Sequence, residues 1–199
     1  MTEEKKRYKV ALIGAPSCGK TTTSVALQSD MSRMDFIVST CFEYAREYLQ
    51  KYEGIEHIAI QSSIGYKQKR REDVLASSCD LLISDSPLFF CYIYALLYAD
   101  PDSRAQMKIM RDLYKWFVLD AVGRYDAIIY LPNQFEIVDD GVRDPEQHEN
   151  ISNLILGFIS SHKHLFKNYM EIRSELTDPQ EILQDRVKMI KKHLKPLIV

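Results

Sequence analysis

The chain has 199 residues, of which 46% are hydrophobic and 27% charged, and its formal net charge at pH 7 is −2. This balance is typical of a globular domain, and so small a net charge gives no general attraction to nucleic acid or membranes. The four cysteines are widely spaced without a C-x-x-C pair, which excludes the common zinc and disulfide patterns. With no signal-peptide pattern and no transmembrane-length apolar stretch, we expect one domain over residues 1–199 in a reducing cytoplasm.

Apolar runs alternate with longer amphipathic stretches along the chain. The predicted strands are those at 8–13, 35–39, 80–85, 126–131 and 169–172. The predicted helices cover 22–28, 42–52, 56–78, 88–99, 103–123, 145–162 and the stretch from 179 onwards. The continuous apolar run before Asp85 indicates a strand buried on both faces. Alternation of this kind predicts the α/β class with a parallel, doubly wound sheet.

Between the first predicted strand and the first predicted helix lies the motif G-x-x-x-x-G-K-[ST], the phosphate-binding loop of P-loop NTPases. Its glycines allow a bent backbone whose N–H groups point at phosphate oxygens. Lys20 is expected to reach the β- and γ-phosphates of ATP, and the Thr21 hydroxyl is expected to bind Mg²⁺. The expected nucleotide-binding residues are Gly14, Ala15, Pro16, Ser17, Cys18, Gly19, Lys20, Thr21 and Thr22.

Two features narrow the class of P-loop protein. The late strand at 126–131 is followed by Pro132, so the guanine-reading N-K-x-D motif of GTPases is missing there. The strand at 80–85 ends in Asp85-Ser86, whereas motor and AAA-type ATPases usually end this strand in Asp-Glu. A single acid followed by a small polar residue suits a small-molecule kinase better.

Asp85 has two interpretations. At the carboxyl end of a strand beside the P-loop, it can bind Mg²⁺ or accept the proton of a substrate hydroxyl. As the first residue of Asp85-Ser86-Pro87, it can equally cap a helix. The functional interpretation is favoured because ligands of α/β proteins bind at the carboxyl ends of strands.

Residues 42–48 form a third candidate region, with Glu43, Arg46 and Glu47 at helical spacing. These residues either form an ordinary exposed helix face or belong to an acceptor site after the second strand. Phe42 is either a stacking surface for a flat ring or a core residue, and Tyr66 is the candidate for a second aromatic wall. The basic run at 67–71 has cations around much of its helix and would favour a polymer substrate if it bound phosphates. The net charge of −2 instead favours a small nucleoside or nucleotide acceptor over nucleic acid.

The polar loop near 133–145 contains Asp139-Asp140-Gly141-Val142-Arg143. Such a loop can close as a lid and bring the Arg143 cation to the transferring phosphoryl group, or it can be a surface turn.

Taken together, the motifs at 14–22, 42–48, 60–61, 84–86, 125–126 and 138–143 resemble the NadR-type ribosylnicotinamide kinase domain, a P-loop kinase of NAD salvage. The resemblance spans most of the chain. It implies a five-stranded parallel sheet flanked by helices, and transfer of phosphate from ATP with Mg²⁺ to a ribose hydroxyl. Lys20, Thr21 and Asp85 match the ATP and metal positions, and Arg143 matches the lid arginine. Phe42 stands where the family has a tryptophan that stacks on nicotinamide.

This sequence departs from the family where the acceptor would bind. The tryptophan is replaced by Phe42, and the family's D-T-D has become Asp85-Ser86-Pro87. We therefore predict an ATP- and Mg²⁺-dependent phosphotransferase for a nucleoside-like hydroxyl, with Lys20, Asp85, Glu43 and Arg143 as catalytic residues. The predicted acceptor-binding residues are Phe42, Glu43, Arg46, Tyr66 and Asp85. Two alternatives stay open: a kinase of deoxynucleoside monophosphates or of a modified base in DNA, and an ATP-binding regulatory switch.

Overall fold

The computed structural model describes residues 6–34, 36–52, 58–135 and 145–198. In this part of the chain, parallel strands form one sheet with the order β2-β3-β1-β4-β5. The strands are β1 Tyr8–Ile13, β2 Val38–Cys41, β3 Leu81–Ser84, β4 Ala127–Tyr130 and β5 Tyr169–Glu171. The helical segments are α1 Lys20–Ser32, α2 Tyr44–Lys51, α3 Ile58–Ala76, α4 Phe90–Tyr98, α5 Arg104–Tyr114, η1 Lys115–Leu119, α6 Asp120–Val122, α7 Pro145–His162, η2 Lys163–Leu165 and α8 Pro179–Ile198. The predicted α/β class and five-stranded parallel sheet are confirmed.

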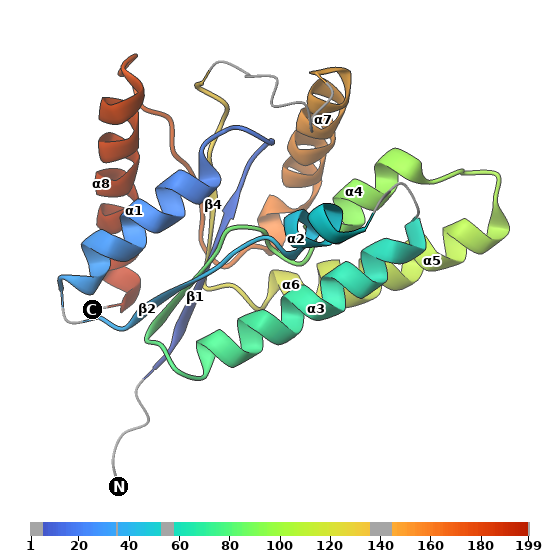
Figure 1. Ribbon diagram of the computed structural model, residues 1–199, viewed down its shortest axis with the longest axis horizontal. Helices are drawn as coiled ribbons and strands as arrows, with labels where there is room; N and C mark the ends of the chain where they lie inside the picture. The colour runs from blue at the N-terminus through green and yellow to red at the C-terminus, as the bar shows by residue number, and fades with distance from the viewer. Residues whose placement is uncertain (1–5, 35, 53–57, 136–144, 199) are drawn as a thin grey trace, which may run out of the picture.

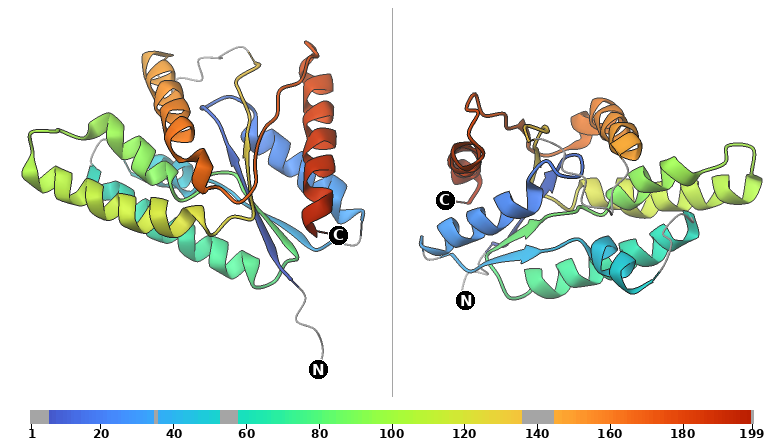
Figure 2. Two further views of the ribbon diagram at one scale, coloured as in Figure 1. Left: turned by 180° about the vertical axis from the view of Figure 1, so that it is seen from behind. Right: turned by 45° about the horizontal axis from the view of Figure 1, so that its top comes forward.

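Helices cover both faces of the sheet. Figures 1 and 2 show α1 and α8 on one side, and α3, α4, α5 and α7 on the other. Strand β1 divides its side chains between these two layers, because successive residues of a strand point to opposite faces. Val10 and Leu12 belong to the apolar cluster under α1 and α8, whereas Ala11 and Ile13 belong to the larger cluster on the other face. All four are buried, as the continuous apolar run predicts for a central strand.

Strand β2 differs from the sequence-based prediction. A strand was expected at 35–39, but the strand covers Val38–Cys41, with Val38 opposite Leu81 and Cys41 opposite Ser84. Pairing with β3 sets this register, and pairing partners are not visible in the local sequence. Helix α2 therefore begins only at Tyr44, and Phe42 and Glu43 form the link at the carboxyl edge of the sheet.

The helix predicted over 103–123 is also modified. It begins at Arg104, but a π-helical segment, Lys115–Leu119, separates α5 from α6. Phe117 of this segment packs so closely on α3 that a Cβ at Gly65 would lie 2.4 Å from its ring. Close helix packing at this point depends on a residue without a side chain.

The cap of the last helix follows its sequence pattern. The Asp178 carboxylate accepts hydrogen bonds of 3.0 Å from the backbone N–H groups of Gln180 and Glu181. The similar cap expected at Asp144 lies outside the described residues. Within the described chain, no helix has the length and apolar character needed to cross a membrane.

Candidate active site

The loop between β1 and α1 has the backbone conformation that its glycines allow. Gly19 has φ 83° and Gly14 has φ 157°. A Cβ at Gly14 would lie 2.4 Å from the Leu131 carbonyl oxygen, and one at Gly19 would lie 2.7 Å from the Phe135 ring. Both positions therefore require glycine, for backbone conformation and for space.

Ser17 also lies in the left-handed region, with φ 61°. A non-glycine residue there costs about 1–3 kcal/mol when the surrounding structure holds it in place. Two buried side chains from distant elements hold this loop. Arg186 of α8 donates to the carbonyl oxygens of Cys18 (2.6 Å) and Pro132 (2.7 Å), and His148 Nε2 of α7 lies 2.8 Å from the Pro16 carbonyl oxygen. Neither residue was identified from the sequence, since no short-range motif marks a contact across more than a hundred residues.

Lys20, the first residue of α1, folds back over the loop. Its Nζ donates hydrogen bonds of 2.8 Å to the carbonyl oxygens of Gly14 and Ala15. The same Nζ lies 5.9 Å from the centre of the Phe90 ring, at the start of α4. The ammonium group therefore lies between the P-loop and the first turn of α4.

Thr21 and Asp85 meet directly. The Thr21 hydroxyl donates a 2.6 Å hydrogen bond to Asp85 Oδ2, which is possible because β1 and β3 are neighbouring parallel strands. Asp85 is buried, with 3% of its surface exposed, and its Oδ1 has no hydrogen-bond partner among the described residues. Burial raises the pKa of Asp85, and the Thr21 hydrogen bond and the charges of Lys20 and Arg46 oppose this rise.

The cap interpretation of Asp85 is not supported by this geometry. Helix α4 begins at Phe90, six residues after the end of β3, and its N-cap is Phe89. The side chain of Asp85 is instead directed at the P-loop threonine.

The oxygens of Thr21 and Asp85 fit a Mg²⁺ ion. Mg²⁺ prefers hard oxygen ligands and is usually held by one or two protein groups together with substrate phosphates and water. The unpartnered, buried Asp85 Oδ1 is the kind of atom that such an ion would satisfy. Among the described residues, no group of three or more His, Cys, Asp or Glu side chains is placed to hold a metal without help from a substrate.

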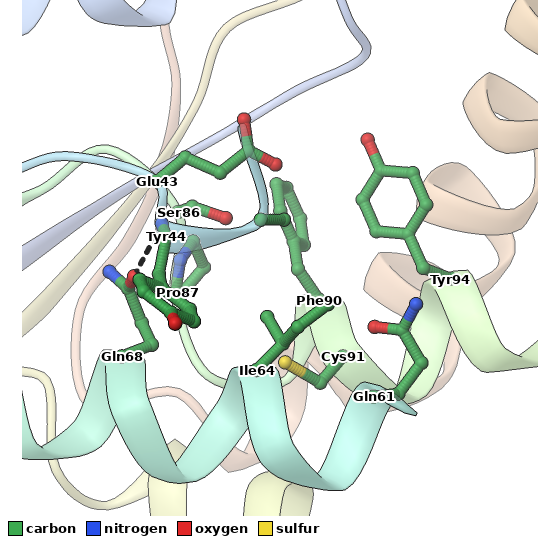
Figure 3. A pocket seen from close by; sticks show the side chains of 11 residues that line it. Glu43, Tyr44, Gln61, Ile64, Gln68, Ser86, Pro87, Phe90, Cys91 and Tyr94 are labelled. Carbon is green, nitrogen blue, oxygen red and sulfur yellow. Dashed lines mark hydrogen bonds between the residues drawn. The ribbon is translucent and has the colours of Figure 1, made fainter. Parts of the chain in front are cut away.

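A small pocket lies next to these residues, between α2, α3 and α4 (Figure 3). Its polar lining comes from Glu43, Gln61 and Ser86, and the Phe90 and Tyr94 rings form an aromatic wall. Phe90 also faces Lys20, so the pocket adjoins the P-loop. Its volume of about 20 Å³ holds no more than a water molecule, and an acceptor would have to displace side chains to enter.

Gln68 of α3 sets the position of the wall of the small pocket that α2 forms. Its Oε1 accepts a 2.9 Å hydrogen bond from the Tyr44 N–H, which fixes the start of α2 (Figure 3). Gln68, Phe90 and Tyr94 were not singled out from the sequence, and Ser86 was noted only as the neighbour of Asp85. They come from three separate elements, so their meeting depends on the tertiary packing.

The remaining predicted acceptor residues are not all brought together. Arg46 is exposed on α2 and close enough to Asp85 for its charge to lower the pKa of that carboxyl group. Phe42 is 46% exposed, which excludes the core interpretation, but it lines a neighbouring groove instead of the small pocket.

Tyr66 does not reach the pocket. Its ring packs on Trp116 and Phe117, with ring centres 5.7 and 5.5 Å apart. The face of α3 that lines the pocket carries Ile64 and Gln68. Tyr66 is two positions from each of them, which rotates it by about 200° around the helix and directs it away from the pocket. Arg143 and most of the loop near 133–145 lie outside the described residues.

A buried acid supports the segment that carries Asp85. Glu72 of α3 is fully buried, and its Oε1 accepts from the Ser84 hydroxyl (2.7 Å) and the Tyr125 hydroxyl (2.9 Å). Its Oε2 accepts from Arg124 Nε at 3.0 Å, and the Tyr125 hydroxyl oxygen accepts from the Leu88 N–H at 3.0 Å. Burial raises the pKa of Glu72, although these hydrogen bonds and the Arg124 charge oppose the rise. The network fixes the turn on both sides of Asp85.

Comparison with known proteins places the chain in a family. A family model described as "AAA domain" (AAA_28) matches residues 9–174. The chain belongs to this family. No curated protein sequence matches the chain.

Solved structures show a similar fold at low sequence identity. The NadR protein in complex with NR has a TM-score of 0.72 at 18% identity, over 94% of this chain and 51% of that chain. NadR in complex with NAD and AMP-PNP has a TM-score of 0.69 at 15% identity, over 95% of this chain and 50% of that one. The present chain thus spans about half of NadR. Deoxyadenosine kinase from M. mycoides, with the products dCMP and dCDP, has a TM-score of 0.70 at 17% identity, over 94% of this chain and 99% of that chain. The fold is that of a P-loop kinase.

Proposed function

We propose that this protein is a Mg²⁺-dependent kinase that transfers the γ-phosphoryl group of ATP to a hydroxyl group of a nucleoside-like acceptor. The observation that carries the proposal is the junction of the P-loop with the small pocket. Lys20 lies 5.9 Å from the Phe90 ring that lines the pocket, and Thr21 is hydrogen-bonded to Asp85, which directly precedes the pocket residue Ser86. A phosphoryl donor on the P-loop and an acceptor in the pocket would thus be neighbours.

The proposed chemistry is mainly positioning and charge stabilisation. Lys20 would exchange its bonds to the loop carbonyls for bonds to the β- and γ-phosphates. Thr21 and Asp85 would hold the Mg²⁺ ion, which when bound neutralises charge on the phosphate oxygens. Arg143 would add a further cation from the proposed lid near 133–145.

Glu43 or Asp85 would accept the proton of the acceptor hydroxyl. The hydroxyl oxygen then forms a bond to the γ-phosphorus while the bond from that phosphorus to the β,γ-bridging oxygen breaks, and ADP leaves. Both carboxylates lie at the carboxyl edge of the sheet, after β2 and β3 respectively.

The pocket chemistry supports a nucleoside-like acceptor. Aromatic rings from Tyr44, Phe90 and Tyr94 suit a flat base, and Glu43, Gln61 and Ser86 can bind hydroxyl groups. The structural relatives were solved with NR, NAD or deoxycytidine nucleotides. Ribosylnicotinamide, as in NAD salvage, and deoxynucleosides or their monophosphates are therefore the first small acceptors to test.

The deciding experiment measures transfer of labelled γ-phosphate from ATP to a panel of nucleosides, nucleoside monophosphates and oligonucleotides in the presence of Mg²⁺. We expect one class of acceptor to become labelled, with ADP formed in equal amount. If the protein binds ATP but labels no acceptor, the kinase proposal is wrong and a nucleotide-dependent switch explains the P-loop better.

A further inference from the structure

A second and larger concavity lies beside the small pocket. This groove, of about 540 Å³, is formed by the end of β2, the start of α2 and one face of α3. Tyr44 lines both the groove and the small pocket, so the two share a wall. Phe42 lines the groove and directly precedes Glu43 of the pocket. The groove is therefore a continuation of the proposed acceptor site.

The basic run of α3 is directed into this groove. Lys67, Arg70, Arg71 and Val74 all line it, and their spacing of i, i+3, i+4 and i+7 places them on one face of the helix. Lys69, the other cation of the run, does not line the groove. Three of the four cations therefore lie on the groove side of α3. The sequence alone suggested instead that the cations surround the helix.

Two of these cations remain available for a ligand. Arg71 makes a double ion pair of 2.5 Å with Glu47 and lies 4.6 Å from the Tyr44 ring centre, so its charge is compensated within the protein. Lys67 and Arg70 are exposed, and neither forms a hydrogen bond or ion pair with any described residue. Glu47 is the only carboxylate in the described groove lining, and Arg71 neutralises it. The groove thus carries an uncompensated positive charge although the whole chain has a net charge of −2.

The groove also presents an aromatic surface. Phe42 is 46% exposed, and it is the only phenylalanine among the exposed large apolar residues in the described part of the chain. An aromatic ring next to unpaired cations is the combination that binds single-stranded nucleic acid, because bases stack on the ring and phosphates pair with the cations. A mononucleotide held in the small pocket would leave a second aromatic surface of this kind unused.

We infer that the groove holds the strand next to the phosphorylated unit, and that the acceptor is a nucleoside unit within a single-stranded polynucleotide. This inference rests on the proposed kinase function. The reacting unit would occupy the small pocket, a neighbouring base would stack on Phe42, and the phosphodiester groups would pair with Lys67 and Arg70. The attraction is local, which is consistent with the absence of a general positive charge.

The binding test uses a fluorescent single-stranded oligodeoxynucleotide of twelve residues and a salt series. The groove variant is Lys67→Ala/Arg70→Ala. The control variant, Lys69→Ala/Lys188→Ala, removes the same charge from exposed positions outside the groove. We expect the groove variant to lose at least tenfold in affinity and to lower the slope of log affinity against log salt by about 1.4, since each phosphate contact to a single strand contributes about 0.7. The control variant should stay within twofold of the wild type.

Phe42→Ala separates stacking from charge. We expect it to weaken binding about tenfold while the salt slope stays at the wild-type value, because no ionic contact is removed. The inference is overturned if the wild type does not bind the strand at low salt, or if both double variants weaken binding equally. It is also overturned if a polyglutamate of equal length, which has no bases, competes as well as the oligonucleotide.

A transfer assay distinguishes this inference from the proposed function. With ATP and Mg²⁺, the oligonucleotide should be a better acceptor than the matching free nucleoside or its monophosphate, and the groove variant should remove only this preference. If free nucleosides are phosphorylated as well as strands and the groove variant changes neither rate, the inference fails while the kinase function stands. If the strand binds through the groove but nothing is phosphorylated, the kinase proposal fails while the groove remains a polynucleotide site.

Discussion

Lys20 and the loop that precedes it are the residues on which phosphoryl transfer would depend most directly. The change Lys20→Ala removes a cation from the proposed position of the transferring group, and such losses reduce kcat by about 10²–10³-fold. Among the described residues, the side chain hydrogen-bonds to the loop carbonyls of Gly14 and Ala15 and to a more distant cysteine sulfur, and it also faces the Phe90 ring. None of these contacts links distant parts of the core, so the fold should persist. Product formation and circular dichroism measured on the same sample check both parts. Wild-type turnover in the folded variant would contradict the P-loop mechanism.

Asp85 is the second residue-scale test. Asp85→Asn keeps the shape of the side chain but removes the charge that would hold Mg²⁺. We expect a fall in kcat of about 10²-fold or more with little change in ATP binding. Titration of activity with Mg²⁺ should show a higher metal requirement in the variant.

Thr21→Ser is the matched control for Asp85→Asn, because it keeps the hydroxyl that bonds to Asp85 Oδ2. It should retain most of the activity. A loss of thermal stability in Asp85→Asn without any change in turnover or in the metal requirement would show that this carboxylate is structural.

These residues differ in how far the sequence could predict them. The P-loop is a contiguous motif, so the sequence was sufficient to predict the conformation of Gly14 and Gly19 and the positions of Lys20 and Thr21. The pairing of Thr21 with Asp85 needed the further knowledge that β3 lies beside β1. Tyr66 was misplaced because an error of one or two positions in a helix rotates a side chain by 100–200°. Arg186 was missed because its contacts to the P-loop depend on how α8 packs.

At the scale of elements, the approach of α3 to η1 depends on Gly65. In Gly65→Ala the new methyl group would overlap the buried Phe117 ring at 2.4 Å, and overpacking of this kind costs about 1–3 kcal/mol of unfolding free energy. Gly157→Ala in α7 is the matched control, since nothing lies within 4 Å of the added atom. The control should be stabilised by about 0.5–1 kcal/mol through its helix propensity. Chemical denaturation of the two variants measures both values, and equal effects would contradict the packing argument.

Glu72 links α3 to the end of β3 and gives a pH prediction. Burial raises its pKa, so between its unfolded value near 4.5 and its higher folded value the folded chain retains a proton that the unfolded chain releases. The stability that this group contributes is therefore present below about pH 4.5 and is lost as the pH rises through the folded pKa. Glu72→Gln removes the titration. The unfolding free energy of the wild type minus that of the variant should fall as the pH is raised from 4 to 8.

Glu47 is the control for the direction of this pH dependence of stability. Its hydrogen bonds with Arg71 lower its pKa, so its contribution is present above the unfolded pKa and is lost as the pH falls. Glu47→Gln should give a pH dependence of opposite direction and smaller size, because the group is exposed and screened by solvent. The same slope for both variants would show that the pH dependence does not come from these carboxylates.

At the scale of the whole molecule, one sheet connects two apolar clusters, and residues of β1 contribute to both. We therefore predict that the chain unfolds as a single domain. Trp116, the lone tryptophan, reports on η1, whereas far-ultraviolet circular dichroism reports on all helices. Denaturation followed by the two signals should give coincident transitions. Two separate midpoints would contradict the single-domain assignment of residues 1–199.

The overall architecture was predictable to the extent that it follows from local pattern. Alternating apolar strands and amphipathic helices are enough for a parallel sheet with helices on both faces. The order β2-β3-β1-β4-β5 was not predictable in the same way, because it depends on which strands pair across long separations. The small pocket and the groove share this limitation, since each combines α2 and α3 with the end of a strand or the start of α4.

The hydrogen bonds of Lys20 to Gly14 and Ala15 have a consequence for nucleotide selection. Before any phosphate arrives, the ammonium group is already solvated by the protein itself, and a ligand gains only the difference between the old and the new bonds. A hydrogen bond from the ammonium to a charged phosphate oxygen is stronger than one to a carbonyl oxygen, so the gain grows with the number of phosphate oxygens that contact Nζ. Two bonds to charged oxygens would be needed to replace both carbonyl contacts, so the lysine would favour a ligand with a longer phosphate chain over inorganic phosphate or a nucleoside monophosphate.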